Sequence, residues 1–235
     1  TCDALGLNVK IMGCLHAGAY DPHDMLYEKG MGRWAIHFEH MLFALVDKIF
    51  VATNFHRELL YKSRSLDMSK VEVTGFPIYP RIPPKTEKLN QIVFPHRFDS
   101  EKNPHLFKDL QAMMKDDLPD WEWVTTANLN DKEQYYTTLE KSEIAISFSD
   151  QETWGIAMQE AVIAGCVPLV PNKLSYKEMY LSEFKYDSIF SVRDRILEIV
   201  GDWDIYKHLC KIQGKAFIGN GDLAFTLITQ HLLEG

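Results

Sequence analysis

The chain has 235 residues, of which 46% are hydrophobic, so it can bury the core of one large domain or of two small ones. Acidic residues outnumber basic ones by 33 to 25, and the formal net charge of −8 argues against a broad nucleic-acid-binding surface, although it leaves room for a local basic groove. We expect neither a signal peptide nor a membrane span, because no apolar run approaches roughly 18 residues.

Four cysteines lie scattered along the chain without a C-x-x-C pair, namely Cys2, Cys14, Cys166 and Cys210. Paired spacings of that kind mark redox and zinc sites, whereas scattered thiols are typical of reducing compartments. We therefore expect reduced, mostly buried cysteines in a cytoplasmic protein.

The amino-terminal third of the chain alternates strand and helix patterns. Residues 9–15 predict an apolar strand, and the loop at its carboxyl end, 16–22, is expected to be flexible. An apolar stripe with helical spacing predicts a helix over 33–45, carrying Trp34, Phe38, Leu42 and Leu45 on one side. The segment 37–40 within it is interpreted as helix surface, because its histidines lack the spacing of a zinc-protease helix.

Two more strands and a linker follow this helix. The strands are expected at 47–52 and 71–74, on either side of a helix over 54–63 that Asn54 caps. A proline-rich stretch without helical period then marks a linker at 76–90. The chain is accordingly divided into a partial amino-terminal α/β domain, the linker and a second α/β domain, at 1–75, 76–90 and 91–235.

The second domain continues the alternation to the end of the chain. Strands are expected at 91–95, 121–126, 143–148 and 166–170. Helices are expected between and after them, at 103–115, 131–141, 154–164, 191–200, 203–217 and 222–233. Because helices separate successive strands, the pattern predicts an α/β fold with a parallel, doubly wound sheet.

Two carboxylates mark the helix at 154–164 as a candidate ligand site. Glu160 has only apolar neighbours one turn away, so it must find hydrogen-bond donors, become protonated or rotate to solvent. Paired ribose hydroxyls would be suitable donors. Glu152 precedes the helix at the carboxyl end of a strand, where open α/β sheets bind ligands. The alternative is that Glu152 is an ordinary surface carboxylate and that Glu160 pairs with a neighbouring helix.

Two cations occupy the first loop of the second domain. Arg97 and Lys102 follow its first strand five positions apart, where they could neutralise a diphosphate leaving group. An ordinary solvated loop is the alternative.

The two glutamates also belong to a longer motif. They are separated by seven residues, Trp154-Gly155 follows the first, and Gly165-x-x-Pro168 follows the second. This pattern resembles the donor-site signature of retaining GT-B glycosyltransferases, especially family 4. The resemblance covers the chain from residue 91 onward, and it implies a GT-B-like fold with a Rossmann-type carboxy-terminal domain and a truncated Rossmann-like amino-terminal part.

The resemblance also implies roles for individual residues. It assigns the ribose hydroxyls to Glu160, and the sugar hydroxyls and diphosphate to Glu152 together with the backbone of Thr153, Trp154 and Gly155. The sequence departs from the family at Thr153, where a glycine is usual.

Three further residues receive roles in the same way. The resemblance assigns Arg97 and Lys102 to the donor phosphates, because family 4 enzymes have an Arg and a Lys at this spacing in this turn. His16 corresponds to a loop histidine that contacts the sugar or the acceptor, although a loop imidazole satisfied by the backbone is an equal alternative. No metal ligand set is recognised, so the implied reaction is metal-independent and uses a GDP- or UDP-hexose as substrate, without a cofactor.

A narrower resemblance concerns the acceptor. The segments Pro95–Phe98, Lys102–Pro104 and Gly155–Met158, with the strand that ends at Pro171, look like the tRNA-queuosine mannosyltransferase branch of these enzymes. This implies a tRNA nucleoside as acceptor, and enzymes that glycosylate modified DNA bases could share the motifs. The short amino-terminal domain suggests that a partner or a further segment completes it. A sugar-nucleotide-binding module without transfer activity and a GT-B sugar-nucleotide epimerase are the alternative functions.

Overall fold

The structure is a computed structural model that describes residues 6, 9–64, 66–79, 81, 86–129 and 131–233. Cys2 and the positions 80 and 82–85 of the expected linker lie outside the described residues. Among the residues described, no helix combines the length and the apolarity of a membrane span.

The chain divides into two compact units. Unit 1 comprises Thr1–Pro77 together with Asn220–Gly235, and unit 2 comprises Ile78–Gly219. The sequence-based division put all of 91–235 into one domain, so the structure differs from it in grouping the last residues with the first unit.

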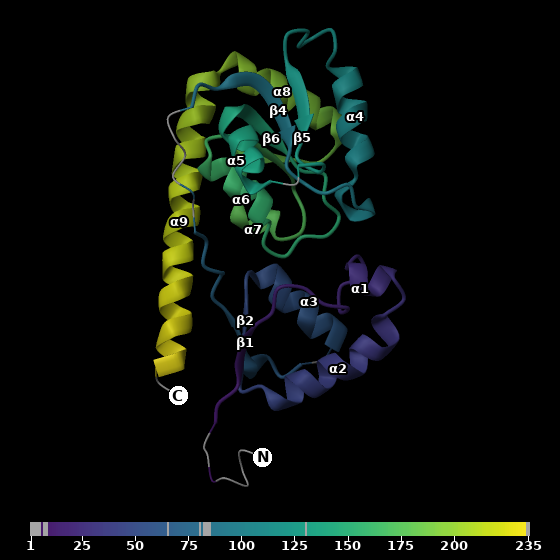
Figure 1. The fold of residues 1–235 in the computed structure, drawn as a ribbon, viewed down its shortest axis with the longest axis vertical. Helices are drawn as coiled ribbons and strands as arrows, with labels where there is room; N and C mark the ends of the chain where they lie inside the picture. Colours follow the sequence, from purple (N-terminus) through teal and green to yellow (C-terminus); the bar gives the residue numbers. More distant parts are fainter. Residues whose placement is uncertain are drawn as a thin grey trace. The chain divides into compact units, whose positions relative to one another are not determined.

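Unit 1 contains a small parallel sheet with the strand order β1-β2-β3, of which Figure 1 labels the first two strands. Its strands are Met12–Cys14, Lys48–Val51 and Val71–Val73. Its helices are α1 at Met25–Glu28, α2 at Gly32–Leu45 and α3 at Asn54–Arg64, followed by a short 3-10 turn, η2, at Met68–Lys70. The expected strands and helices of this part of the chain are present, and α1 and η2 were missed because each is a single turn.

Burial in unit 1 departs from what the apolar pattern alone suggests. Within the loop 16–22, Ala19, Tyr20 and Asp21 are at most 5% exposed. On the apolar stripe of α2, Trp34 and Phe38 are more than half exposed.

The buried face of α2 is a different face from its apolar stripe, and it contacts the loop 16–22. It carries Ala35, Glu39 and Phe43, and the Glu39 carboxylate accepts a hydrogen bond from the Ala19 backbone N–H at 2.7 Å. Arg64 of α3 pairs with the same carboxylate at 2.7 Å. Glu39 belongs to the segment 37–40 that was interpreted as surface, and this buried ion pair could not be read from helical spacing alone.

Unit 2 contains a five-stranded parallel sheet with the order β5-β4-β6-β7-β8. The strands β4 to β8 are Leu89–Phe94, Glu122–Thr125, Ser142–Ile146, Val167–Pro171 and Lys185–Tyr186. The helices α4 to α8 are Pro104–Met113, Lys132–Lys141, Ile156–Ile163, Tyr176–Met179 and Ile189–Gly201, with the 3-10 turns η3 at Ser100–Lys102 and η4 at Ser182–Phe184. The parallel, doubly wound α/β fold predicted from the alternation is confirmed.

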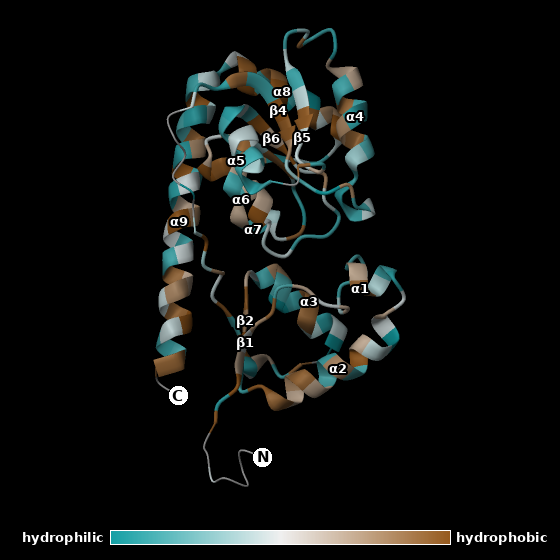
Figure 2. Ribbon diagram, viewed as in Figure 1, coloured by the Kyte–Doolittle hydropathy of each residue, from teal (hydrophilic) through white to brown (hydrophobic). Residues whose placement is uncertain are grey.

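The core of unit 2 is built from the central strands. Ile92 and Val93 of β4 and Ile144 and Ile146 of β6 are completely buried, and Figure 2 shows hydrophobic residues concentrated along β4. Helices cover both faces of the sheet, since α4 contacts α8 on one side while α5 and α6 contact each other on the other. Strands buried on both faces are expected to be continuously apolar, as these are.

The strand order creates a switch point between β4 and β6. The chain leaves β4 toward β5 on one side, and β6 continues toward β7 on the other side. The loops after β4 and β6 therefore diverge at the carboxyl edge of the sheet, which is where open α/β sheets bind ligands.

The last helix, α9, spans Trp203–Leu233 and is continuous in Figure 1. Two helices, at 203–217 and 222–233, were expected here, and the residues between them include Gly219, Asn220 and Gly221, which are poor helix formers. Each glycine costs a helix about 1 kcal/mol, which packing on both sides of the break can offset. Phe217, before the expected break, is 2% exposed, and Ala224, after it, is completely buried.

Candidate active site

The loops after β4 and β6 meet through an ion pair. Lys102, in η3 after β4, places its Nζ 3.4 Å from Glu152 Oε2 and donates a hydrogen bond of 2.6 Å to the carbonyl of Gln151. The Lys102 side chain is 8% exposed and that of Glu152 is 16% exposed. The structure thus brings two of the sequence-predicted site residues together at the switch point.

Glu152 also closes the start of α6. Its Oε1 accepts hydrogen bonds from the backbone N–H groups of Gly155, at 2.8 Å, and Trp154, at 3.4 Å. These are among the N–H groups that the family resemblance assigns to the diphosphate. An anion is favoured at this position because the first N–H groups of a helix have no partner within it. In the structure, that anion is the Glu152 carboxylate.

The backbone conformation at Gly155 shapes this turn. Gly155 precedes α6 with a φ of 66°, in the left-handed region that glycine adopts most easily. A Cβ atom at this position would lie 2.8 Å from Cε1 of the buried Tyr176 ring. The sequence placed the helix start at Trp154, two residues early, because Trp154 is apolar and buried but lies in the turn.

Buried polar side chains form hydrogen bonds in and beside the same turn. Gln159 is completely buried and donates a hydrogen bond of 2.6 Å to the Trp154 carbonyl. Ser147 Oγ lies 3.0 Å from Ser149 Oγ and 3.1 Å from the Tyr176 hydroxyl. Thr153 and Trp154 are themselves 2% and 5% exposed, so the turn before α6 is part of the packed interior. Sequence reasoning missed Gln159 as a supporting residue, although its polarity in an apolar helix was a signal.

Arg97 lies in the same loop as Lys102, but its side chain has other contacts. Its Nε is 3.0 Å from Asp99 Oδ2, and its Nη2 is 3.7 Å from Glu101 Oε1. The side chain is 71% exposed, and neither of these ion pairs involves Glu152. The structure therefore joins Lys102 directly to Glu152 and leaves Arg97 at the surface of the loop.

Glu160 has found protein donors. Tyr135 and Tyr136 of α5 donate hydrogen bonds of 2.8 and 2.9 Å, one to each oxygen of its carboxylate. Burial and then the Glu160 charge raise the pKa of Tyr135, and burial followed by the hydrogen bond to Glu160 raises that of Tyr136. Both phenols therefore stay protonated and act as donors. Of the outcomes considered for Glu160, the structure shows pairing with a neighbouring helix.

The two tyrosines do not occupy all the hydrogen-bond acceptor positions of the Glu160 carboxylate. Two carboxylate oxygens offer about four lone-pair positions, and the tyrosines use two of them. Two adjacent tyrosines, at 135 and 136, stand in the sequence as possible donors, but only the packing of α5 against α6 shows that they contact Glu160.

His96 was not among the predicted site residues, although it lies in the same loop as Lys102. It precedes Arg97, is 5% exposed, and its Nε2 has no hydrogen-bond partner among the described residues. Burial, and then the charges of Lys102 and Arg97, lower the pKa of His96 to about 3. A neutral imidazole therefore lies beside the Lys102 loop.

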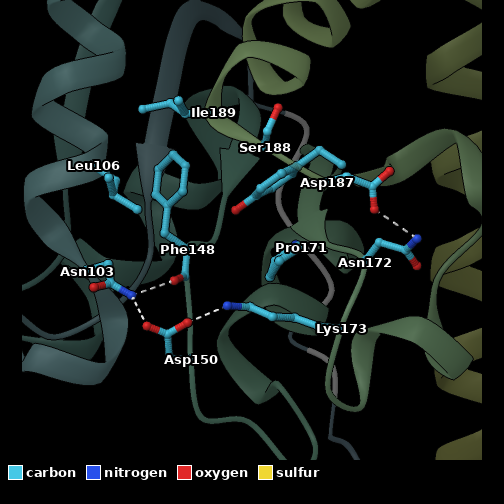
Figure 3. Close-up of a pocket in the computed structure, with 11 residues that line it drawn as sticks. Asn103, Leu106, Phe148, Asp150, Pro171, Asn172, Lys173, Asp187, Ser188 and Ile189 are labelled. Atoms are coloured by element: carbon cyan, nitrogen blue, oxygen red, sulfur yellow. Dashed lines mark hydrogen bonds and ion pairs between the residues drawn. The ribbon is translucent and has the colours of Figure 1, made fainter.

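A pocket of about 390 Å³ adjoins the switch point at the carboxyl ends of β6, β7 and β8 (Figure 3). Asp150 lies on its edge, between the amide of Asn103, at 2.6 Å, and the ammonium of Lys173. Phe148 and Tyr186 supply its apolar wall. Its volume is in the range of small-molecule sites, so a ligand held by Lys102 and Glu152 has a concave surface next to it.

His16 belongs to unit 1, and its contacts lie within that unit. Its ring packs against Phe76 with the ring centroids 5.8 Å apart. The loop that follows it is held by Glu39 and by a hydrogen bond of 2.6 Å between the Tyr20 hydroxyl and His56 Nε2. Burial lowers the pKa of His56 to about 4, so this imidazole is neutral.

The chain is similar to known proteins in part of its sequence and in its fold. No protein-family model matches the chain. The tRNA-queuosine alpha-mannosyltransferase of Drosophila melanogaster is 31% identical over 126 residues, which cover 43% of this chain and 33% of that protein. The chain therefore matches about a third of the length of this curated relative.

Solved structures match over nearly the whole chain. HepE of Anabaena, in complex with UDP and glucose, aligns with a TM-score of 0.74 at 9% identity over 96% of this chain and 72% of its own. The pneumococcal O-GlcNAc transferase GtfA, in complex with UDP and GlcNAc, aligns with a TM-score of 0.69 at 11% identity over 94% of this chain and 52% of its own. The fold resemblance inferred from the glutamate motif is thereby confirmed, and the chain has the α/β fold, with Rossmann-like parallel sheets, of the GT-B glycosyltransferases.

Proposed function

We propose that this chain carries the donor site of a metal-independent retaining glycosyltransferase, which moves a hexose from a nucleotide-diphospho-sugar to an acceptor hydroxyl. The observation that carries the proposal is the meeting of Lys102 and Glu152 at the start of α6, at the switch point of a GT-B sheet. A cation, a carboxylate and helix N–H groups at one position suit a ligand that is both a polyol and an anion.

The start of α6 would bind the diphosphate by exchange. Glu152 now accepts hydrogen bonds from the N–H groups of Trp154 and Gly155. A phosphate oxygen can take over these donors, and Glu152 then turns its oxygens to the sugar hydroxyls while Lys102 stays within reach of both groups. The exchange conserves the number of hydrogen bonds, so its cost is small compared with that of leaving buried N–H groups unpaired.

Arg97 would join the site from the surface of its loop. Its ion pairs to Asp99 and Glu101 involve an arginine that is 71% exposed, and exposed pairs contribute only about 0–1 kcal/mol. A diphosphate dianion can therefore compete for the guanidinium. Arg97 and Lys102 together would neutralise the charge that grows on the diphosphate as its bond to the sugar breaks.

Glu160 would hold the ribose hydroxyls of the donor. Tyr135 and Tyr136 fix its carboxylate and leave lone pairs for two more donors. In the reaction, the acceptor oxygen forms a bond to the anomeric carbon on the face from which the diphosphate leaves. The acceptor proton passes to a departing phosphate oxygen, and no protein nucleophile is required.

The acceptor is proposed from the sequence match. The Drosophila relative is a tRNA-queuosine mannosyltransferase, which favours GDP-mannose as donor and a tRNA nucleoside as acceptor. Solved neighbours bound to UDP keep a UDP-hexose as the other donor to test. We assign His16 to contacts with the sugar or the acceptor.

One assay tests this proposal. The protein is incubated with a panel of radiolabelled GDP- and UDP-hexoses, with and without tRNA, and label in tRNA, in free sugar and in epimerised donor is measured separately. Transfer to tRNA that is lost in Lys102→Ala supports the proposal. Donor binding without transfer or hydrolysis would indicate a binding module, and epimerised donor without an acceptor would indicate an epimerase.

A further inference from the structure

A second concave surface lies in unit 2, at the amino edge of the sheet. It is a groove of about 560 Å³ between the end of α6, Gly165 before β7, and the first half of α9, and we call it the α9 groove. The candidate donor site lies at the opposite, carboxyl edge of the same sheet. The α9 groove therefore needs an explanation that the donor site does not supply.

The rim of the α9 groove is basic. Lys207, Lys211 and Lys215 follow one another at intervals of four residues along α9, which places them on one face about 6 Å apart. His208 lies on the same rim. Residues 205–218 contain no Asp or Glu, in a chain whose net charge is −8.

Two of these lysines are available to a partner. Lys211 and Lys215 are exposed, and neither has an ion pair within the part of the chain that the structure describes. Lys207 differs, because its Nζ is 3.2 Å from Glu143 Oε1 and lies 4.8 Å from the centroid of the Trp203 ring. The unneutralised charge of the α9 groove therefore rests on Lys211 and Lys215.

Contacts with Cys166 and Val162 fix the position of α9 at the groove. Cys210 donates a hydrogen bond from its Sγ to the Cys166 carbonyl at 3.1 Å, and Gly214 is buried against Val162. Each of these residues immediately precedes a lysine of the row, so the row lies along the edge of the packed face. The floor of the groove is apolar, and Val162 and Ile163 contribute to it.

We propose that the α9 groove binds the sugar-phosphate backbone of an RNA acceptor. Ammonium groups at regular spacing suit successive phosphates, and an apolar floor suits the ribose carbons between them. This inference rests on the proposed function, because it assigns the acceptor class to a surface away from the transfer site. The acidic remainder of the chain would confine RNA to this groove and so orient it.

The geometry requires a large acceptor. β7 separates the two edges of the sheet and has five residues, which corresponds to about 17 Å. A folded RNA can span this distance, so that one part of it lies in the α9 groove while its modified nucleoside reaches the carboxyl edge. A mononucleoside could not use both sites.

The test measures binding of a fluorescently labelled tRNA transcript to the full chain by anisotropy at several salt concentrations. We expect Lys211→Glu/Lys215→Glu to weaken binding at least tenfold and to lower the slope of log affinity against log salt by about one to two. Lys108→Glu/Lys115→Glu is the matched control, since it reverses two exposed lysines at another surface. It should leave both quantities near their wild-type values.

Other outcomes would overturn the inference. Equal losses in the two double variants would show a general charge effect, and unchanged tRNA binding in both would remove RNA from the α9 groove. If polyglutamate binding alone is lost in Lys211→Glu/Lys215→Glu, the groove serves an acidic protein. Calorimetry of sugar-nucleotide binding to the same variants separates these results from a failure of the donor site, because that binding should not change.

Discussion

Glu160 shows how a single residue can be identified from sequence while its partners cannot. Its isolation on an apolar helix predicted a carboxylate that needs donors, and the donors are the hydroxyls of Tyr135 and Tyr136. Those tyrosines lie 25 and 24 positions away in the chain. Residue spacing within one helix carries no information about such contacts between helices.

Replacing Glu160 with alanine should weaken donor binding. The change removes the proposed acceptor of both ribose hydroxyls, so we expect the dissociation constant of the preferred sugar nucleotide to rise at least tenfold, or ~1.4 kcal/mol. Isothermal titration calorimetry measures it, with the exposed Glu87→Ala as control. Donor affinity equal to that of the wild type would exclude Glu160 from the ribose site.

Gly155 permits a second test on the residue scale. Gly155→Ala forces a Cβ atom into a left-handed turn, within 2.8 Å of the Tyr176 ring. We expect a loss of about 1–3 kcal/mol in the free energy of unfolding, measured with urea, together with weaker donor binding. Gly201→Ala is the control, because that glycine lies in α8 with no neighbouring atom within 4 Å of the new Cβ. Similar stability of the two variants would contradict a strained turn at Gly155.

Elements were predicted better than their boundaries and tertiary contacts. All the strands of three or more residues were expected from β-branched and apolar runs, since buried parallel strands require them. The break predicted near Gly219 was wrong because propensity is local, whereas α9 is stabilised by packing along its length. The hydrogen bond from the Ala19 N–H to Glu39 of α2 likewise joins residues 20 positions apart, so local patterns do not predict it.

Lys88 connects three elements of unit 2. Its Nζ donates to the carbonyls of Ser142, at 2.6 Å, Ala164, at 2.9 Å, and Leu139, at 3.4 Å. These carbonyls belong to the start of β6 and the ends of α6 and α5. A cation there satisfies helix carbonyls that have no partner within the helix.

Replacing Lys88 with methionine should therefore destabilise unit 2. The change keeps the length of the side chain and leaves half-buried carbonyls without their donor, so we expect a loss of about 2 kcal/mol in the free energy of unfolding. Lys141→Met, at the exposed end of α5, is the control and should change it by less than about 0.5 kcal/mol. Chemical denaturation measures both, and equal values would show that Lys88 is an ordinary surface lysine.

At the scale of the whole molecule, buried neutral histidines couple stability to pH. Burial lowers the pKa of His56 in unit 1 to about 4 and that of His96 in unit 2 to about 3, from an ordinary value of 6.5. Below pH 6.5 the unfolded chain therefore binds protons that the folded chain does not. Their contribution to stability is present above pH 6.5 and is lost as the pH falls toward 4 and 3.

We expect the free energy of unfolding to fall by up to about 1.4 kcal/mol per pH unit for each of these histidines between pH 6 and pH 4.5. Urea denaturation of the wild type and of His56→Gln and His96→Gln at four pH values measures this dependence. Each variant should have a shallower slope than the wild type. Parallel slopes in all three proteins would mean that other groups control the acid sensitivity.

The continuity of α9 limits how this protein can be divided by genetic means. Unit 1 includes Asn220–Gly235, and His231 near the end of the chain lies 2.9 Å from Glu72 and packs on Phe50. A gene shortened at the linker would encode the part of unit 1 that ends at Pro77 without this closing segment. Residues on both sides of unit 2 must therefore be synthesised before unit 1 is whole, and a premature stop codon near residue 219 would damage unit 1 as well as α9.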